Sequence, residues 1–279
     1  MLKSPGESRP SISISAVAAG LALFVVGLLV FGCATSPLGR KQLKLLPSDE
    51  VNRAGGRAFH EILAQKPQTA DVLATARVRC VTAFLARGIP GPAGELDWHV
   101  VVFEASEPNA FALPGGRIGV NRGMLDVATT PDQLAAVLGH EMAHVQADHA
   151  NERMSANLAA TGAVTLLSIA AARADLPARH AANLLGAGAQ LGILFPYSRA
   201  HEREADLLGL DLMARVGFDP DAAVLLWQRM SAARKSTPPE FLSTHPASES
   251  RIAELRQRLP HARFLYRDAR AAGHRPVCE

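Results

Sequence analysis

One pentapeptide, His140-Glu141-Met142-Ala143-His144, constrains this chain of 279 residues more than any other feature. It reads H-E-x-x-H, and in a helix its two histidines project from one face, one turn apart. That spacing lets both imidazoles reach a single zinc ion. The glutamate then lies beside the metal, where it could take a proton from a water that the metal activates. The pentapeptide therefore predicts a hydrolytic metal centre, provided that the segment is helical.

The residues around the pentapeptide are typical of an amphipathic helix. Thr130 can cap the helix, Pro131 suits its first turn, and Gln133 completes a capping box. An apolar stripe at helical spacing follows, formed by Leu134, Val137, Leu138, Met142 and Val145. We expect one helix from about Pro131 to about Met154. The alternative to a metal site is a pair of core or surface histidines.

A catalytic zinc site has three protein ligands and keeps a fourth position open. The segment Ser198–Asp206 reads S-R-A-H-E-R-E-A-D and continues as an amphipathic helix. Glu202 and Asp206 are four residues apart, so Glu202 could bind the metal while Asp206 accepts a hydrogen bond from a ligand histidine. Glu204 is the rival ligand, but the position four residues after it is not acidic. On this segment alone, a solvated and ion-paired helix face is the alternative.

Taken in order, these blocks resemble the HtpX-like gluzincin peptidases. The match begins with H-E-x-x-H followed by S-R-x-x-E-x-x-A-D. Three further stretches agree: Glu107–Gly116 resembles the family's edge-strand segment, Gly139–Val145 its active-site helix, and Ser243–Pro246 with Arg251 a third block. The similarity covers about residues 45–260.

The resemblance implies a fold, a cofactor and a role for each matching residue. The fold would be α+β, mainly α, a zincin-like domain with a small sheet and the H-E-x-x-H helix. His140, His144 and Glu202 would bind one Zn²⁺ per chain. Glu141 would be the general base and then the general acid toward the leaving amine. Asp206 would orient a ligand histidine.

Two roles are open for His245. It could donate to the tetrahedral oxyanion with Arg251 supporting it, or it could close the fourth zinc position and hold the enzyme inactive. A residue at a helix start, before Pro246, is the structural alternative. His149 and His201 fall outside the ligand faces, so we expect them to be surface or packing residues.

A small sheet is predicted before the metal-binding helix. Trp98–Phe103 is rich in β-forming residues, and Phe111–Leu113 and Ile118–Val120 read as short strands around a Pro-Gly-Gly turn. An exposed sheet edge can bind an extended peptide through main-chain hydrogen bonds. The resemblance assigns this substrate contact to Asn109, Ala110, Phe111 and Ala112. An ordinary sheet edge is the alternative.

The first forty residues decide the expected compartment. Lys3 and Arg9 precede an uncharged run from Ser11 to Gly39. Its apolar centre ends at Val30–Cys33, and the whole resembles a bacterial lipoprotein signal. We therefore predict a signal peptide at 1–32, lipidation of Cys33, an N-terminal linker at 33–44 and a metallopeptidase domain at 45–279. The apolar run is also close to the length that spans a bilayer, so an uncleaved anchor is the alternative.

Both possibilities put the catalytic domain outside the cytoplasm. By resemblance to Gram-negative lipoproteins, Ala34 after the cysteine favours the outer membrane, facing the periplasm, over an inner-membrane anchor. In an oxidising periplasm Cys80 and Cys278 would be able to pair, with two free thiols as the alternative. The expected partners are the membrane, through the lipid anchor, and protein or peptide substrates of the envelope.

Nucleic acid is excluded as a partner, because the net charge is only +3 and no Lys/Arg block with stacking aromatics is present. Oligomeric state is not indicated.

Two apolar runs, Asn157–Ala172 and Ala181–Phe195, flank a polar hinge at Arg173–His180. Each run is short for a membrane span, so we expect buried or membrane-surface helices.

Further on, Asp219-Pro220 should start a helix that reaches about Arg234. Pro238-Pro239 should mark a loop that delivers His245, and Pro246 should open a last helix that ends at about Leu259.

The function that the resemblance implies is zinc-dependent endoproteolysis of misfolded or misassembled cell-envelope proteins. The competing hypothesis is a zinc-stabilised periplasmic chaperone or assembly factor, in which proteolysis is slight or gated. The two differ in whether Glu141 matters, because a structural zinc site needs no general base.

Overall fold

The computed structural model describes residues 33–173, 197–233, 240–245 and 249–279. Several sequence predictions lie outside these residues: the signal peptide 1–32, residues 174–180 of the hinge, the second apolar run, the Pro238-Pro239 loop and the helix start at Pro246.

The described residues form a mainly helical α+β fold, as predicted. The strands are β1 (Cys33–Thr35), β2 (Lys41–Leu43), β3 (His99–Phe103), β4 (Ala110–Leu113) and β5 (Arg117–Asn121). The helices are α2 (Ser48–Gln65), α3 (Val72–Gly88), the 3₁₀ turn η1 (Pro92–Glu95), α4 (Arg122–Val127), α5 (Pro131–Gln146), α6 (His149–Arg173), α8 (Arg199–Arg215), α9 (Asp221–Ala233), α10 (Glu240–Thr244) and α11 (Glu249–Ala271).

The central sheet has the strand order β3-β5-β4. β3 and β5 are parallel, whereas β4 runs antiparallel to β5 with Ala112 opposite Ile118. The turn between β4 and β5 needs Gly115 and Gly116, whose φ angles of 83° and 77° are unfavourable for other residues. Within the described part of the chain no strand pairs with the outer side of β4, so β4 is an edge strand, as the sequence predicted.

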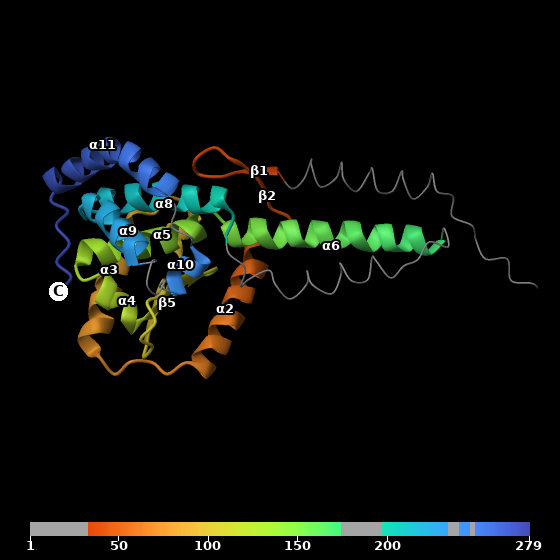
Figure 1. The fold of residues 1–279 in the computed structure, drawn as a ribbon, viewed down its shortest axis with the longest axis horizontal. Helices are drawn as coiled ribbons and strands as arrows, with labels where there is room; N and C mark the ends of the chain where they lie inside the picture. The colour runs from red at the N-terminus through yellow and green to blue at the C-terminus, as the bar shows by residue number, and fades with distance from the viewer. Residues whose placement is uncertain (1–32, 174–196, 234–239, 246–248) are drawn as a thin grey trace, which may run out of the picture.

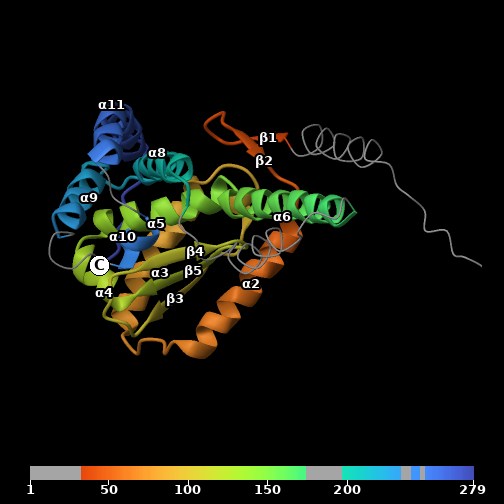
Figure 2. The ribbon, with the colours of Figure 1, turned by 45° about the vertical axis from the view of Figure 1, so that its right-hand side comes forward.

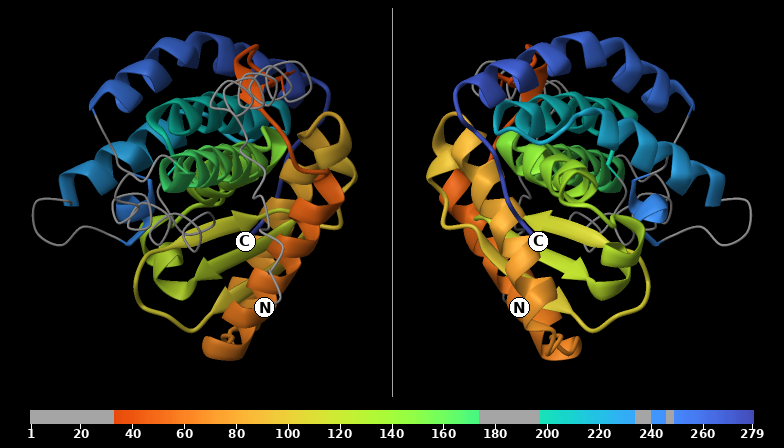
Figure 3. Two further views of the ribbon diagram at one scale, coloured as in Figure 1. Left: turned by 90° about the vertical axis from the view of Figure 1, so that its right-hand side faces the viewer. Right: turned by 90° about the vertical axis from the view of Figure 1, so that its left-hand side faces the viewer.

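The helices are layered over this sheet (Figure 3). α5 covers the sheet, α8 lies on α5, and α11 lies on α8, while α3 packs against α5 and β3. Side chains of β5 and α5, including Ile118, Leu138 and Met142, are fully buried in one core. Each such side chain stabilises the fold by about 1.5–3 kcal/mol. The two helices that carry the predicted ligands, α5 and α8, therefore lie in the middle of the packed layers.

The helix predicted from Pro131 to Met154 is in fact two helices, and that prediction was wrong. α5 ends at Gln146, and α6 begins at His149. Between them Asp148 has a φ of 53°, a left-handed conformation that aspartate tolerates better than most residues. This break turns the chain, and α6 then projects away from the rest of the domain (Figures 1 and 2).

The first apolar run, Asn157–Ala172, is helical and lies within α6, as expected. Among the described residues, no helix is both long enough and apolar enough to cross a membrane.

Residues 33–43, which were expected to be part of a linker, form an antiparallel hairpin of β1 and β2. We call residues 33–43 the N-terminal hairpin. It lies beside the start of α6 (Figure 1). There Gln42 Nε2 donates to the carbonyl of Ala147 at 2.7 Å, and just after the hairpin the amide of Leu45 donates to Ser155 Oγ at 2.8 Å. The hairpin is thus fixed to the segment that joins α5 and α6.

At the C-terminal end, α9 matches the predicted helix after Pro220, but α11 is longer than expected. It continues past Pro260 to Ala271 instead of ending at about Leu259. Proline removes one helical hydrogen bond. However, Leu259 and Ala262 on either side are buried in the core, and this packing holds the helix together.

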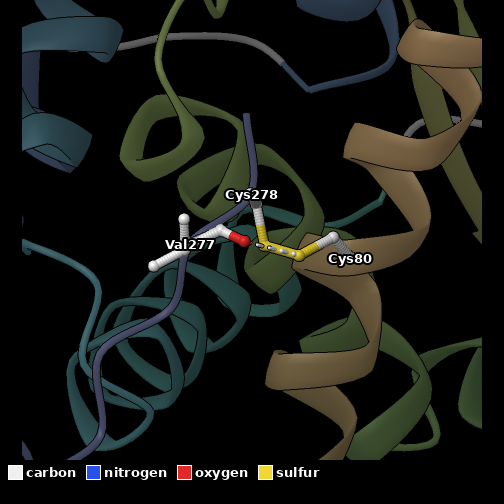
Figure 4. Close-up of a disulfide and its surroundings, with 3 residues drawn as sticks. All are labelled: Cys80, Val277 and Cys278. Atoms are coloured by element: carbon white, nitrogen blue, oxygen red, sulfur yellow. Dashed lines mark hydrogen bonds between the residues drawn. A yellow bond between two sulfur atoms is a disulfide. The ribbon is translucent and has the colours of Figure 1, made fainter.

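A disulfide joins Cys80 of α3 to Cys278 near the C-terminus (Figure 4). The pairing that the sequence allowed is therefore present, with the two Cα atoms 5.5 Å apart. The bond links residues 198 positions apart in the sequence. A cross-link that closes so long a loop removes much conformational freedom from the unfolded chain.

Candidate metal centre

Local sequence signals fix where the two central helices begin. Thr130 Oγ1 accepts from the amide of Gln133 at 3.2 Å, which is the predicted N-cap of α5. Gln133 Oε1 accepts from the amide of Thr129 at 3.0 Å, one residue earlier than in a standard capping box. In α8, Ser198 Oγ accepts from the amide of His201 at 3.2 Å. These caps place the H-E-x-x-H residues deep in α5 and Glu202 in the first turn of α8.

Four buried side chains from three segments of the chain meet at one place. His140 and His144 come from α5 and Glu202 from α8, while His245 directly follows α10. One ligand atom from each of the four lies within 4.8 Å of the others. His140 Nε2 is 3.2 Å from His144 Nε2 and 3.1 Å from His245 Nδ1. The Glu202 carboxylate lies 3.5 Å from Nε2 of each α5 histidine and 3.0 Å from His245 Nδ1.

These spacings fit the coordination shell of a metal ion. Ligand atoms about 2.0–2.1 Å from a tetrahedral zinc would be about 3.3–3.4 Å from one another. Five of the six separations, 3.0–3.5 Å, bracket that value, and all four ligand atoms lie within 4.8 Å of one another. Imidazole nitrogens and a carboxylate are also the donors that such a site uses. The four residues could therefore hold a metal ion.

The surrounding charges favour a cation here. Burial alone would lower the pKa of His140, but the carboxylates of Asp206 and Glu202 outweigh it and raise that pKa to about 9. In the same way, burial would raise the pKa of Glu202, yet hydrogen bonds from His140 and His245 lower it well below its usual range. A positive charge at His140 is thus stabilised by the two carboxylates, whereas burial and the neighbouring imidazoles lower the pKa of His144.

Asp206 and Arg251 lie behind the cluster. Asp206 Oδ1 is 3.0 Å from His140 Nδ1, on the side of the ring away from the other ligand groups. Arg251 donates to both Asp206 oxygens at 2.6 and 2.8 Å, and its third nitrogen lies 2.9 Å from Glu202. Burial would raise the pKa of Asp206, but Arg251 outweighs this effect and lowers it. Arg251 thus holds two carboxylates in place around His140.

Glu141 lies between the cluster and the edge strand. Its Oε2 accepts from the amide of Ala112 in β4 at 3.2 Å, and its Oε1 lies 3.4 Å from His245 Nε2. Burial raises the pKa of the Glu141 carboxyl. Of the predicted substrate-contact residues Asn109–Ala112, Ala112 contacts Glu141, whereas Phe111 packs its ring on Phe103.

Sequence reasoning missed the surroundings of His144. His149 is fully buried, so of the two expected roles it has that of a packing residue, but its Nδ1 is 3.0 Å from Nδ1 of the ligand histidine His144. His201, also buried, stacks on His149. Glu204, the rival ligand, lies outside the cluster and contacts His149 at 3.2 Å. Tyr197 stacks on His144 with ring centroids 3.9 Å apart, and burial raises the pKa of its hydroxyl to about 12.

The helix break explains why His149 was missed. On an uninterrupted helix, a residue five positions after His144 would point about 140° away from it. The left-handed Asp148 between α5 and α6 turns the ring of His149 back toward His144. No motif signals Tyr197, which lies one residue before the cap of α8.

A protein-family model described as peptidase family M48 matches residues 73–259. The mitochondrial metalloendopeptidase OMA1 of Schizosaccharomyces pombe is 43% identical over 171 residues, which are 60% of this chain and 48% of that protein. The human mitochondrial metalloendopeptidase OMA1 is 33% identical over 236 residues, 81% of this chain and 44% of that protein. The β-barrel assembly-enhancing protease of Escherichia coli K12 is 34% identical over 172 residues, 58% of this chain and 34% of that protein. The match thus spans about half the length of these relatives, or less.

Proposed function

The chain belongs to peptidase family M48, and on that premise we propose that it is a zinc-dependent endopeptidase. The observation that carries the proposal is the buried convergence of His140, His144 and Glu202 with Glu141 at its side. Three ligands of this kind and an adjacent carboxylate are what a hydrolytic zinc site needs. The relatives named metalloendopeptidases support the same class of reaction.

Zinc held by His140, His144 and Glu202 would polarise the attacking water and the scissile carbonyl. Glu141 accepts the proton of that water and passes it to the leaving amine. The raised pKa of Glu141 makes it a stronger base than an exposed carboxylate. The Ala112 amide holds this side chain in place.

The edge strand supplies the substrate contact in this proposal. An extended peptide added along the outer edge of the stretch Asn109–Ala112 would bind through free main-chain groups of that edge, next to the Ala112 amide that holds Glu141. Main-chain recognition is largely independent of sequence, which suits cleavage within unfolded segments. Asp206 and Arg251 hold His140 and Glu202 in position, as supporting carboxylates and cations commonly do around metal ligands.

For His245, we propose that it closes the fourth zinc position rather than donates to the oxyanion. Its Nδ1 lies 3.1 Å from His140 Nε2 and 3.0 Å from the Glu202 carboxylate, which are separations expected between ligands of one metal ion. Its Nε2 lies 3.4 Å from Glu141. A ring in this position would occupy the fourth coordination place of a bound metal and contact Glu141, so it would exclude the attacking water. Proteolysis then requires His245 to move, which makes the enzyme gated by its substrate or a partner.

Within family M48 we propose an HtpX-like, envelope-facing member that removes misfolded or misassembled envelope proteins. The name of the Escherichia coli relative supports an envelope role. Comparison of new protein termini in envelope extracts of cells that carry the parent or the Glu141→Gln variant tests it. Envelope proteins cut only in the presence of the parent are expected, and identical termini in both would contradict the proposal.

We further propose that Cys33 carries the lipid anchor in the outer membrane. The Cys80–Cys278 disulfide supports an oxidising compartment outside the cytoplasm. With Cys33→Ser, incorporation of labelled fatty acid should be lost. If the parent is not labelled, and the Cys33→Ser variant still fractionates with the membrane as the parent does, the uncleaved anchor would be favoured instead.

Metal removal tests the catalytic proposal. The purified full-length chain in detergent should lose cleavage of unfolded casein after treatment with a chelator and recover it on addition of one zinc per chain. Cleavage that persists after the metal is gone would overturn the proposal. Bound zinc without cleavage, even when His245 is replaced, would support the chaperone hypothesis.

A further inference from the structure

The two α5 histidines are supported in different ways on the sides of their rings that face away from the cluster. Nδ1 of His140 faces a carboxylate directly, that of Asp206, at 3.0 Å. Nδ1 of His144 instead faces another imidazole, Nδ1 of His149, at 3.0 Å. His149 is fully buried, and its other nitrogen, Nε2, lies 3.2 Å from Glu204 Oε2. A buried imidazole therefore stands between Nδ1 of His144 and the carboxylate of Glu204.

The hydrogen positions follow from the connectivity. Nε2 of His144 faces the cluster, so a metal there leaves the ring hydrogen of His144 on Nδ1. That hydrogen can be donated only if Nδ1 of His149 accepts it. The hydrogen of His149 is then on Nε2, where the Glu204 carboxylate accepts it. One arrangement of hydrogens thus satisfies all three side chains.

Glu204 is itself held by the N-terminal hairpin. Arg40 Nε donates to Glu204 Oε2 at 3.0 Å, and the amide of Leu38 donates to Oε1 at 3.3 Å. The side chain of Glu204 is only 4% exposed, so these charged contacts are screened little by water. The two remaining nitrogens of Arg40 donate to Glu152 of α6, each at 2.6 Å. Arg40 is therefore fixed in orientation and directs one donor at Glu204.

We propose that Arg40 of the N-terminal hairpin is a positioning residue for the metal ligand His144, acting through Glu204 and His149. This inference rests on the proposed function, because it requires a metal at His144. The arrangement parallels Arg251 and Asp206 behind His140, but with one more side chain in the series. Its consequence is that metal affinity depends on how the hairpin, which directly follows the predicted anchor segment, is docked.

Zinc affinity of the full-length chain, measured by competition with a chromogenic chelator, tests the proposal. Glu204→Gln keeps the shape of the side chain but removes its charge, and should weaken zinc binding about 10- to 100-fold. Arg40→Gln should weaken it in the same direction, while Arg40→Lys, which keeps a cation beside Glu204, should restore most of the affinity. The Arg40→Gln/Glu204→Gln double variant should bind zinc as Glu204→Gln does, because Arg40 acts through Glu204.

Two controls separate positioning from simple loss of structure. Asp221→Asn removes the exposed ion pair of another arginine, Arg263, which is outside this series of contacts, so it should leave zinc affinity unchanged. The visible spectrum of bound Co²⁺ should shift in Glu204→Gln, because the orientation of a ligand changes, and stay as in the parent in Asp221→Asn.

Unchanged zinc affinity in both Arg40→Gln and Glu204→Gln would overturn the proposal. So would independent, additive losses in the double variant. A parent chain that binds no metal would instead refute the proposed function itself, which keeps the two failures distinct.

Discussion

Gly209 of α8 lies directly against Gly139 of α5, the residue before His140, where the two helices cross. A Cβ atom on Gly209 would be 2.8 Å from both the carbonyl carbon of Gly139 and the amide nitrogen of His140. Both contacts are with backbone, which cannot move aside as a side chain can. The two glycines therefore set the distance between the helix that carries the histidines and the helix that carries Glu202.

We predict that Gly209→Ala lowers both stability and metal affinity. Overpacking costs about 1–3 kcal/mol, and the higher helix propensity of alanine offsets about 1 kcal/mol of this at most. Urea unfolding and zinc competition measure the two effects. The matched control is Gly56→Ala in α2, where a Cβ meets nothing within 4 Å and stability should rise. If the two variants were equally stable and zinc affinity were unchanged, Gly139 and Gly209 would not set the distance between α5 and α8.

Removal of His245 should raise activity. His245→Ala opens the fourth position and frees Glu141, so turnover of an unfolded protein should increase while zinc affinity falls through loss of a ligand. Initial rates at saturating substrate and chelator competition separate the two effects. A fall in turnover with zinc affinity preserved would instead assign His245 to the oxyanion.

Acid should weaken the contacts of Glu204. Burial would raise its pKa, but hydrogen bonds from His149, Ser36 and Arg40 outweigh it and lower the pKa to about 2 from the ordinary 4.5. The unfolded chain then binds a proton that the folded chain does not, so the stability from this group is present above about pH 4.5 and is lost toward pH 2. In chelator, the unfolding free energy of the parent should fall more steeply over this range than that of Glu204→Gln. If the unfolding free energies of the two proteins fell in parallel with pH, the lowered pKa of Glu204 would be contradicted.

Local spacing made much of the cluster predictable. The pair His140 and His144, and the pair Glu202 and Asp206, each lie four residues apart, so any helix presents both members on one face. The caps at Thr130 and Ser198 fixed the starts of those helices. The structure brings these residues together, and their chemical roles stay predictions for the experiments above.

What could not be predicted depends on backbone conformation or on distant contacts. The break at Asp148 carries no glycine or proline, and it reverses the expected orientation of His149. Arg40 is 164 residues from Glu204 in the sequence, and no periodicity connects them. The hairpin itself appeared to be a linker, because its short strands are ordered by contacts with α6 rather than by their own composition.

The most direct test of the account is the zinc content and casein cleavage of the full-length chain beside its Glu141→Gln variant, both measured in the His245→Ala background. The variant keeps the size of the Glu141 side chain but cannot accept a proton. We predict about one zinc per chain in both proteins and cleavage only where Glu141 is intact. Equal cleavage by both proteins, or no zinc in either, would contradict the central claim that this site is a zinc endopeptidase.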